Sequence, residues 1–590
     1  MEEYEKLYSI NGPVVTIKGK TTFAMGEMVF VGTSRLVGEV ILLTDELTTI
    51  QVYEDTSGIK PGDPVYGSGQ PIFVTLGPGI LNNIFDGIER PLEKIALKSG
   101  TYIQKGVSVP SLDMEKKWQT TVKIKEGQYV LGGEILAEVP ETEGIIHKSL
   151  IPPKVKGVVT YAAPDGEYTI DDVIARVKTT LGNEVEVKLA QRWPIREPRP
   201  YGSRFVSSVP LITGQRVIDT FFPIAKGGTA AIPGGFGTGK TMSQHQIAKW
   251  ADADIIIYIG CGERGNEMTE VLEDFSKLVD PRSGKSLMQR TCLIANVSNM
   301  PVAAREASIY TGITLAEYYR DMGYHVAVMA DSTSRWAEAL RELSGRLEEM
   351  PAEEGFPAYL ASRLSGFYER AGYIETLNGK EGSVSIIGAV SPQGGDFSEP
   401  VTQNTKRFVR CFWGLDRGLA YSRHYPAIHW LTSYSEYLDN LSAWFDVHVN
   451  EQFVPYRNRM VAILNEESSL MEIVKLIGSD VLPDSQRLTL EIAKVIRVGF
   501  LQQNAFHPED TCVPLNKQFL MMKTILYLND TAQKLVAANI PMSILKREDI
   551  FDRVTNIKFD VPNDKPEMFD DYITAIDDFY NKVMKEQGLA

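Results

Sequence analysis

The run Gly234-Gly235-Phe236-Gly237-Thr238-Gly239-Lys240-Thr241 constrains the fold of this chain more than any other feature. It matches the pattern G-x-x-x-x-G-K-[ST] in full. Glycines let backbone N–H groups turn inward around an anion, and the N-terminus of a following helix adds further donors and a positive dipole end. A strand candidate, Thr229–Ile232, precedes the run and a helix candidate, Met242–Ala251, follows it. The run therefore predicts a phosphate-binding loop rather than a chance glycine-rich turn.

Every residue of this loop, from Gly234 to Thr241, is a candidate for nucleotide binding. Lys240 is expected to reach the β- and γ-phosphates, and is a candidate catalytic residue for that reason. The hydroxyl of Thr241 is expected to bind Mg²⁺, which would accompany ATP or ADP as the substrate.

Alternating strands and helices surround the loop. Short apolar strands alternate with amphipathic helices from about residue 195, which implies a mostly parallel sheet with helices on both faces. The remaining strand candidates are Asp254–Gly260, Thr291–Val297 and His325–Ala330, and a second helix is expected at Ala303–Met322.

One carboxylate follows a predicted strand at the sheet edge where α/β folds bind ligands. Asp331 comes directly after His325–Ala330 and is a candidate for orienting Mg²⁺. The alternative is a buried aspartate in a turn. Because a phosphate loop needs a second strand that ends in a carboxylate, we favour the metal role.

A second carboxylate and two arginines are candidates for the chemical step. Glu263 lies just past the strand candidate Asp254–Gly260 and can activate an attacking water, which is worth roughly 10²–10⁴-fold in rate. A structural ion pair is the alternative for Glu263, and Glu267 on the same loop is the alternative base. Arg264 and Arg335 can add positive charge where a transferring phosphoryl group develops negative charge.

The two ends of the chain differ from this α/β core. Short β-rich runs at Val14–Ile17, Glu39–Leu43 and Thr49–Tyr53 predict a small barrel, since closure removes exposed strand edges. A second β-rich stretch resembles a lipoyl-like sandwich but lacks a Met-Lys-Met attachment turn, so a structural or docking module is expected there. Helical periodicity, as in Leu488–Leu501 and Lys517–Ala537, dominates the C-terminal part. The expected domains are a barrel at 1–75, a connection at 76–111, the β-rich insertion at 112–190, the α/β nucleotide-binding core at 191–435 and a helical domain at 436–590.

Composition excludes several functional classes. The formal net charge of −15 argues against a nucleic-acid binder, because phosphate contacts need clustered Lys and Arg. The four cysteines are scattered without a CxxC pair, so neither a zinc site nor a disulfide framework is expected, and a reducing cytoplasm fits best. No apolar run approaches the ~20 residues that a membrane span needs. Any membrane association is therefore expected to be indirect, through partner proteins.

Motifs along nearly the whole chain are similar to those of one family, the catalytic A subunit (alpha chain) of the archaeal/vacuolar-type (V/A-type) rotary ATPases. They are Leu76-Gly-Pro-Gly79, Phe85-Asp-Gly87, Thr213-Gly-Gln-Arg216-Val-Ile-Asp219, Pro301-Val-Ala-Ala-Arg305-Glu306, Asp331-Ser-Thr-Ser-Arg335-Trp336, Gly355-Phe-Pro-Ala-Tyr359-Leu360, Ser391-Pro392-Gln393-Gly394-Gly395-Asp396 and Leu501-Gln-Gln-Asn-Ala505-Phe506. The β-rich insertion matches the segment that separates these A subunits from the F-type β subunit.

This resemblance implies a RecA-like phosphate-loop core and a set of partners. It implies three A subunits alternating with three non-catalytic B-type subunits around central shaft subunits, with peripheral stalk subunits and a membrane sector that moves H⁺ or Na⁺. The complex would lie on the cytoplasmic face of the membrane and either hydrolyse or synthesise ATP. The resemblance assigns Lys240, Thr241 and Glu263 to catalysis, places Arg264 near the γ-phosphate, and assigns the walls of the adenine pocket to Tyr425 and Phe506, with Ala505 beside them.

Departures from the family pattern occur in two loops. Gly235 and Gln393 stand where many relatives carry proline, which would restrict φ. Thr238 stands where eukaryotic vacuolar forms carry a redox-sensitive cysteine, which favours a prokaryotic enzyme. Other classes fit less well: a non-catalytic ring subunit would lack Lys240 and Glu263, a RecA-like helicase would carry a basic surface, and a type III secretion ATPase would lack the insertion.

Overall fold

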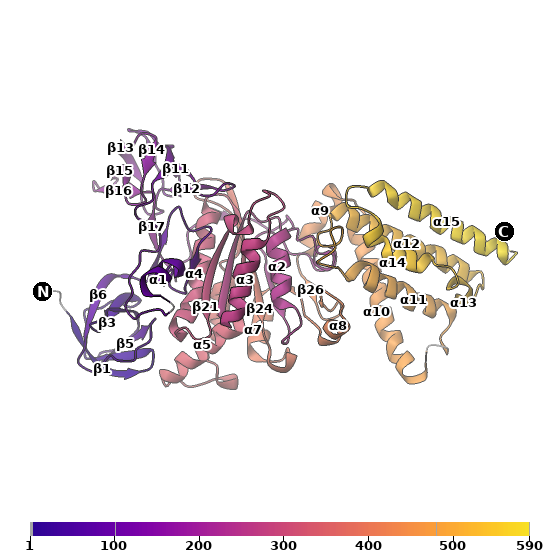
Figure 1. Cartoon of the computed structure of the whole chain (residues 1–590), viewed down its shortest axis with the longest axis horizontal. Coiled ribbons are helices and arrows are strands. Elements are labelled where there is room, and N and C mark those ends of the chain that lie inside the picture. Colours follow the sequence, from indigo (N-terminus) through magenta and orange to yellow (C-terminus); the bar gives the residue numbers. More distant parts are fainter. Residues whose placement is uncertain (1–3, 101, 479–480, 589–590) are drawn as a thin grey trace. The chain divides into compact units, whose positions relative to one another are not determined.

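The computed structural model describes residues 4–100, 102–478 and 481–588 (Figure 1). Packing within these residues divides the chain into two compact units. Unit 1 comprises Met1–Val206, Lys226–Thr229 and Ala253–Val409, and unit 2 comprises Ser207–Ala225, Ala230–Asp252 and Arg410–Ala590. Unit 1 contains the β-rich modules and most of the parallel strands. Unit 2 contains the phosphate loop and the C-terminal helices, so the expected core at 191–435 contributes to both units.

The N-terminal strands close into the expected barrel, in the order β1-β2-β5-β4-β3-β6. Their bounds are β1 Glu5–Asn11, β2 Val14–Lys18, β3 Glu27–Val31, β4 Leu36–Leu43, β5 Leu47–Val52 and β6 Pro64–Pro71. Alternate residues such as Val29, Val31 and Ile50 are buried inside, as the two-residue period of a strand requires. Strand β7 (Phe73–Leu76) lies outside the barrel and pairs with β17 (Gln191–Pro194), the strand that follows the insertion.

The insertion is a sandwich of two four-stranded sheets, with orders β10-β13-β15-β16 and β12-β11-β9-β14. The strands are β9 Trp118–Val122, β10 Tyr129–Val130, β11 Ile135–Pro140, β12 Ile146–Leu150, β13 Gly157–Ala162, β14 Gly166–Tyr168, β15 Val173–Thr179 and β16 Glu184–Lys188. Neighbouring strands are antiparallel, so each sheet buries one face and exposes the other.

A parallel sheet forms the centre of unit 1, with strand order β24-β22-β20-β21-β8. Its strands are β8 Ile84–Phe85, β20 Ile255–Glu263, β21 Thr291–Val297, β22 His325–Asp331 and β24 Glu381–Val390, and the antiparallel pair β18 Ser203–Arg204 and β23 Gly372–Glu375 joins at β24. The helices are α1 Leu92–Ser99, α3 Gly265–Lys277, α4 Val302–Asp321, α5 Thr333–Arg346, α6 Leu360–Tyr368 and α7 Pro400–Phe408. Helix α4 packs on β20, β21, β22 and β24 and is buried along most of its length.

Unit 2 combines a short sheet with the C-terminal helices (Figure 1). Strand β19 (Thr229–Pro233) pairs in parallel with β25 (Cys411–Phe412), which pairs with β26 (Tyr434–Ser435). The helices are α2 Lys240–Trp250, α8 Arg417–Tyr421, α9 Leu438–His448, α10 Phe453–Ile477, α11 Asp484–Val495, α12 Leu515–Ala537, α13 Met542–Leu545, α14 Ile550–Asp560 and α15 Phe569–Glu586. None of the helices within the described ranges is both long and apolar enough to cross a bilayer.

Several expected boundaries differ from the structure by one or more residues, and three of the differences have clear local features. Helix α2 begins at Lys240, inside the loop motif, because Gly239 has φ +90° and ends the preceding turn. Strand β20 continues to Glu263, so this residue ends the strand instead of following it. The helix expected at Leu488–Leu501 is α-helical only to Val495 and then widens into a π-helical turn, Ile496–Leu501.

Glu141 joins the insertion to the α/β part of unit 1. Its carboxylate accepts hydrogen bonds from the amides of Gly79 (2.9 Å) and Leu81 (3.0 Å) and from the hydroxyl of Tyr319 (2.9 Å). Burial raises the pKa of this carboxyl group. The three donors belong to the connection and to α4, so one buried side chain orients three segments.

Replacing Glu141 with alanine should therefore destabilise unit 1. The substitution leaves buried donors without an acceptor, which costs about 1–3 kcal/mol. Chemical unfolding of the full chain, followed by tryptophan fluorescence, measures the loss. The matched control is Glu143→Ala, which removes an exposed ion pair with Lys285 and should cost at most about 1 kcal/mol. Equal effects of the two substitutions would contradict the role of Glu141.

Candidate active site

The phosphate loop has the geometry that its glycines predict. Gly237 (φ +75°) and Gly239 (φ +90°) both adopt the left-handed conformation, which is strained for residues with a Cβ atom. Lys240 begins α2, and its Nζ donates to the carbonyl oxygens of Gly234 (2.7 Å) and Gly235 (3.1 Å). The ammonium thus lies folded over the loop, next to the backbone N–H groups at the helix start.

A cavity of about 1200 Å³ adjoins this loop within unit 2. Gly237 and Gly239 line one part of it, and Tyr425, Ala505 and Phe506 line another. Phe506 is 88% exposed and Tyr425 is 42% exposed, so both rings present faces to whatever occupies the cavity. Phe236, another loop residue, is also exposed. The structure therefore brings the expected phosphate-binding and base-binding residues of unit 2 to the same cavity.

The carboxylates expected to perform the chemistry belong to unit 1. Asp331 ends β22 and lies opposite Gly260 on the neighbouring strand β20, which itself ends at Glu263. Asp331 is buried and accepts a hydrogen bond from the hydroxyl of Tyr258 (3.1 Å). Because parallel strands end at the same edge of a sheet, the two carboxylates are neighbours.

A bulge directs Glu263. The pairing of β20 with β21 shifts register between Cys261 and Glu263, and Gly262 at this point has φ +73°. Such a bulge adds one residue and re-aims the side chain that follows. Burial, the negative charge of Asp331 and a hydrogen bond with the Glu267 carboxyl group together raise the pKa of Glu263. A carboxyl group with a raised pKa is suited to exchanging a proton near neutral pH.

The two candidate arginines differ in their surroundings. Arg335, near the start of α5, donates to Glu338 (3.0 Å), which raises its pKa. Its positive charge also acts on Glu263 and opposes the rise in that pKa. Arg264 precedes α3, where its amide and the side chain of Glu267 form a capping box, and its guanidinium is 62% exposed. Arg335 is therefore the better placed of the two to act on the acidic pair.

The oxygen donors of the candidate metal ligands suit Mg²⁺. Asp331 offers a carboxylate and Thr241 a hydroxyl group, and Mg²⁺ prefers hard oxygen ligands of this kind. Across residues 4–100, 102–478 and 481–588, no three His, Cys, Asp or Glu side chains form a cluster that could hold a metal ion.

Sequence reasoning missed several residues that line the cavity of unit 2. Among them are Gln215, Met242, Gln246, Arg423, Asn504, Lys558 and Phe559. Lys558 and Phe559 come from α14, more than 300 residues after the loop, and no local pattern marks them. Tyr258, the partner of Asp331, lies inside an apolar strand, and nothing in the sequence indicated a function for its hydroxyl group.

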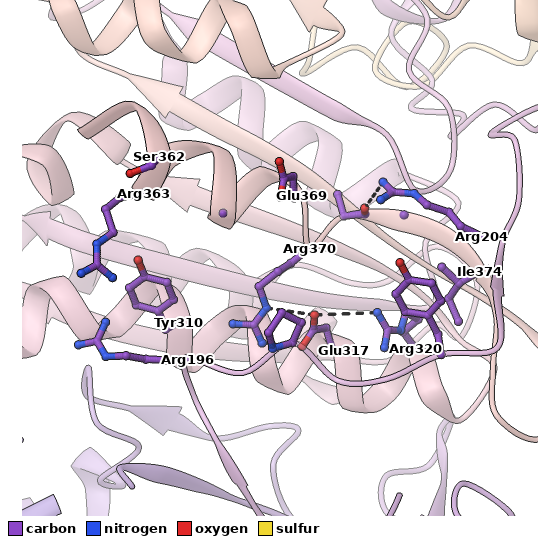
Figure 2. A pocket seen from close by; sticks show the side chains of 15 residues that line it. Arg196, Arg204, Tyr310, Glu317, Arg320, Ser362, Arg363, Glu369, Arg370 and Ile374 are labelled. Carbon is purple, nitrogen blue, oxygen red and sulfur yellow. Dashed lines mark hydrogen bonds and ion pairs between the residues drawn. The ribbon is translucent and has the colours of Figure 1, made fainter. Parts of the chain in front are cut away.

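A second cavity, of about 480 Å³ in unit 1, is lined by five arginines (Figure 2). Figure 2 shows Arg370 and Arg320 reaching the same carboxylate, that of Glu317. Ion pairs in this region include those of Arg196 with Glu39 and Glu306, of Arg320 with Asp321, and of Arg370 with Glu317. Since these ion pairs connect Glu39 of the barrel with residues of α4, the cluster is best explained as a structural joint between the barrel and α4.

Family models match four parts of the chain. The nucleotide-binding domain of the ATP synthase alpha/beta family matches residues 214–435, and the beta-barrel domain of that family matches residues 7–69. The barrel-sandwich domain of ATP synthase alpha/beta subunits matches residues 109–196. The C-terminal domain of V and A type ATP synthases matches residues 442–544. These matches confirm the expected fold class.

Similar proteins with curated names cover almost the whole chain. The V-type ATP synthase alpha chain of Halothermothrix orenii is 58% identical over 99% of both chains. The A subunit of the A-type ATP synthase from Methanopyrus kandleri is 55% identical over 98% of both chains. Among solved structures, the assembled ATPase EscN of the enteropathogenic E. coli type III secretion system has a TM-score of 0.62 at 21% identity, and the match covers 89% of this chain and 100% of that one. That likeness shows the fold alone, whereas the sequence identities show that the chain belongs to the alpha chain (A subunit) family of V-type and A-type ATP synthases.

Proposed function

We propose that this chain converts Mg-ATP and water to ADP and phosphate, or runs the reverse reaction, as the catalytic subunit of a V/A-type rotary ATPase. The observation that carries the proposal is the phosphate loop beside an aromatic-walled cavity on unit 2. Such a cavity offers a nucleotide both of the contacts it needs. The loop amides and Lys240 bind phosphates, and Tyr425 and Phe506 pack against a planar base.

The chemical step needs more than binding. Glu263 is proposed to accept the proton of the attacking water, and Asp331 and Thr241 to hold Mg²⁺, which would neutralise charge on the phosphates. Arg335 is proposed to stabilise negative charge on the transferring phosphoryl group. The position of Glu263 and Asp331 at the ends of neighbouring parallel strands supports these roles, as does the raised pKa of Glu263.

Assembly extends the proposal. We expect an alternating ring of three such chains and three B-type subunits, central shaft subunits, peripheral stalk subunits that contact the sandwich at 112–190, and a membrane sector that moves H⁺ or Na⁺. Membership of the family supports this arrangement. The soluble ring would then lie peripherally on the cytoplasmic face of the membrane, with no role in nucleic-acid binding.

Replacing Lys240 with alanine should abolish turnover. The substitution removes the charge that the loop presents to the β- and γ-phosphates, while the backbone donors remain. Steady-state ATPase activity of the reconstituted ring measures the effect. Lys249→Ala, in the same helix but over the ring of Trp250 (4.8 Å), is the control and should keep most of the activity. Retention of more than half of the activity by Lys240→Ala would refute the assignment.

Replacing Glu263 with glutamine should separate binding from chemistry. Glutamine preserves the shape but cannot accept the proton, so ATP should bind while turnover falls by roughly 10²–10⁴-fold. Nucleotide titration and single-turnover kinetics measure the two quantities. Glu267→Gln serves as the comparison, because Glu267 is the alternative base on the adjoining helix. If Glu267→Gln shows the larger loss of turnover, the two roles are exchanged.

The isolated chain should hydrolyse ATP slowly until its B-type neighbour is added. Phosphoryl transfer usually needs an arginine that reaches the transition state, often from a neighbouring chain, and this arginine is worth roughly 10³–10⁵ in rate. The family resemblance assigns that arginine to the B-type subunit. Titrating the purified chain with the B-type partner, with light scattering to verify the monomer, should show this rise in turnover per site. A monomer as fast as the ring would exclude a shared site.

A further inference from the structure

The segment Gln502–Phe506, called here the base loop, forms one wall of the cavity in unit 2. Gln502, Gln503, Asn504, Ala505 and Phe506 all line that cavity. The amide of Gln503 donates to the carbonyl of Tyr425 (2.8 Å), so the base loop is tied to the other aromatic wall. The position of the base loop therefore sets the distance between the two surfaces that would contact a base.

The base loop starts where a helix has widened. The turn Ile496–Leu501 is π-helical, and its last wide bond runs from the amide of Gln502 to the carbonyl of Arg497 (2.9 Å). The next amide, that of Gln503, donates to Tyr425 instead of to Val498. The series of helical backbone hydrogen bonds therefore ends before the carbonyl oxygen of Val498, which needs another donor. Single π-helical turns of this kind frequently occur at functional sites.

Lys558 of α14 supplies the missing donor. Its Nζ donates to the carbonyl oxygens of Val498 (2.6 Å) and Gln502 (3.0 Å), and the side chain is almost fully buried. The carbonyl of Gln502 also accepts from Nη2 of Arg216 (2.8 Å). One ammonium thus joins the middle of the wide turn, at Val498, to Gln502, the first residue of the base loop.

The position of Lys558 is itself fixed by a second buried lysine. Nζ of Lys517, on α12, donates to the carbonyl oxygens of Lys558 (3.1 Å) and Val561 (2.7 Å) at the end of α14. A continuous series of hydrogen bonds therefore runs from α12 through α14 to the base loop. Displacement of these C-terminal helices would be transmitted to the wall of the cavity.

This arrangement is costly, which argues that it does more than fill space. Arg216, Lys517 and Lys558 are buried together, and Asp510 pairs with Arg216. Burial and the charge of Arg216 lower the pKa values of Lys517 and Lys558 to about 8. Apolar side chains at positions 517 and 558 could fill the same space without the cost of burying an ammonium group, but they could not donate hydrogen bonds to carbonyl oxygens.

We propose that Lys558 is a positioning residue that holds the base loop at the distance from Tyr425 at which Phe506 and Tyr425 can both contact an adenine base. Through this residue, nucleotide affinity depends on the position of the C-terminal helices. The inference rests on the proposed function, because it takes the cavity to be the site of the base. It concerns the base alone. The hydrogen bonds of Lys558 reach Val498 in the wide turn and Gln502 at the start of the base loop, and they do not involve the phosphate loop.

The test compares two ligands on the full chain carrying Lys558→Met. ATP uses both the phosphate loop and the base loop, whereas inorganic tripolyphosphate uses only the phosphate loop. Lys558→Met should weaken ATP binding by about tenfold, equivalent to about 1.4 kcal/mol, and change tripolyphosphate binding by less than about threefold. Lys558→Arg, which keeps a charged donor, should restore most of the ATP affinity. Isothermal titration calorimetry measures all these affinities.

Controls separate this inference from the proposed function. Lys565→Met removes an exposed lysine shortly after α14 and should change neither affinity. If the wild-type chain binds no ATP, the proposed function fails. If it binds ATP and Lys558→Met leaves that affinity unchanged, or weakens both ligands equally, the positioning role is overturned. Circular dichroism verifies folding, and should Lys558→Met not fold, Lys558→Gln, which keeps one amide donor, must show the same selective loss for the role to stand.

Discussion

Backbone N–H groups can surround a phosphate only where side chains leave room, and the rest of the proposed site depends on this constraint. Gly237 and Gly239 adopt positive φ values, and a Cβ atom at Gly234 would come within 2.5 Å of the Thr238 hydroxyl. The glycines place the start of α2 at Lys240, which brings the helix dipole and the ammonium to the same point. The roles proposed for the other candidate residues all presuppose that phosphates bind at this anion site.

Strong periodicity and glycine chemistry made much of this fold predictable. Local sequence patterns predicted the strands of the barrel and the sandwich, the parallel strands, and the long helices α4 and α12. Each of these elements buries residues at a regular interval along one segment. The placement of Asp331 followed from the same reasoning, because a buried strand followed by a carboxylate puts that group at the ligand-binding edge. These predictions needed no knowledge of which segments pack together.

Features that depend on packing between distant segments were not predictable. The bulge at Gly262 extends β20 to Glu263 and arises from the pairing of β20 with β21. The periodicity of one segment carries no information about such pairing. The π-helical turn at Ile496–Leu501 looks like ordinary helix by spacing, and its widening is stabilised by Arg216 and Lys558 from remote parts of the chain. The grouping of the phosphate loop with the C-terminal helices in one compact unit was likewise hidden.

Buried charge is used in two different ways in this chain. Around Glu317 and Arg370 in unit 1, buried arginines form ion pairs with buried carboxylates, and these pairs act as a joint (Figure 2). In unit 2, Arg216 and two lysines outnumber Asp510, and carbonyl oxygens take the place of the missing carboxylates. Carbonyl dipoles belong to the backbone, so any movement of the lysines moves the main chain directly. The ion pairs of unit 1 therefore join side chains to side chains, whereas the buried cations of unit 2 join side chains to the main chain that carries the base loop.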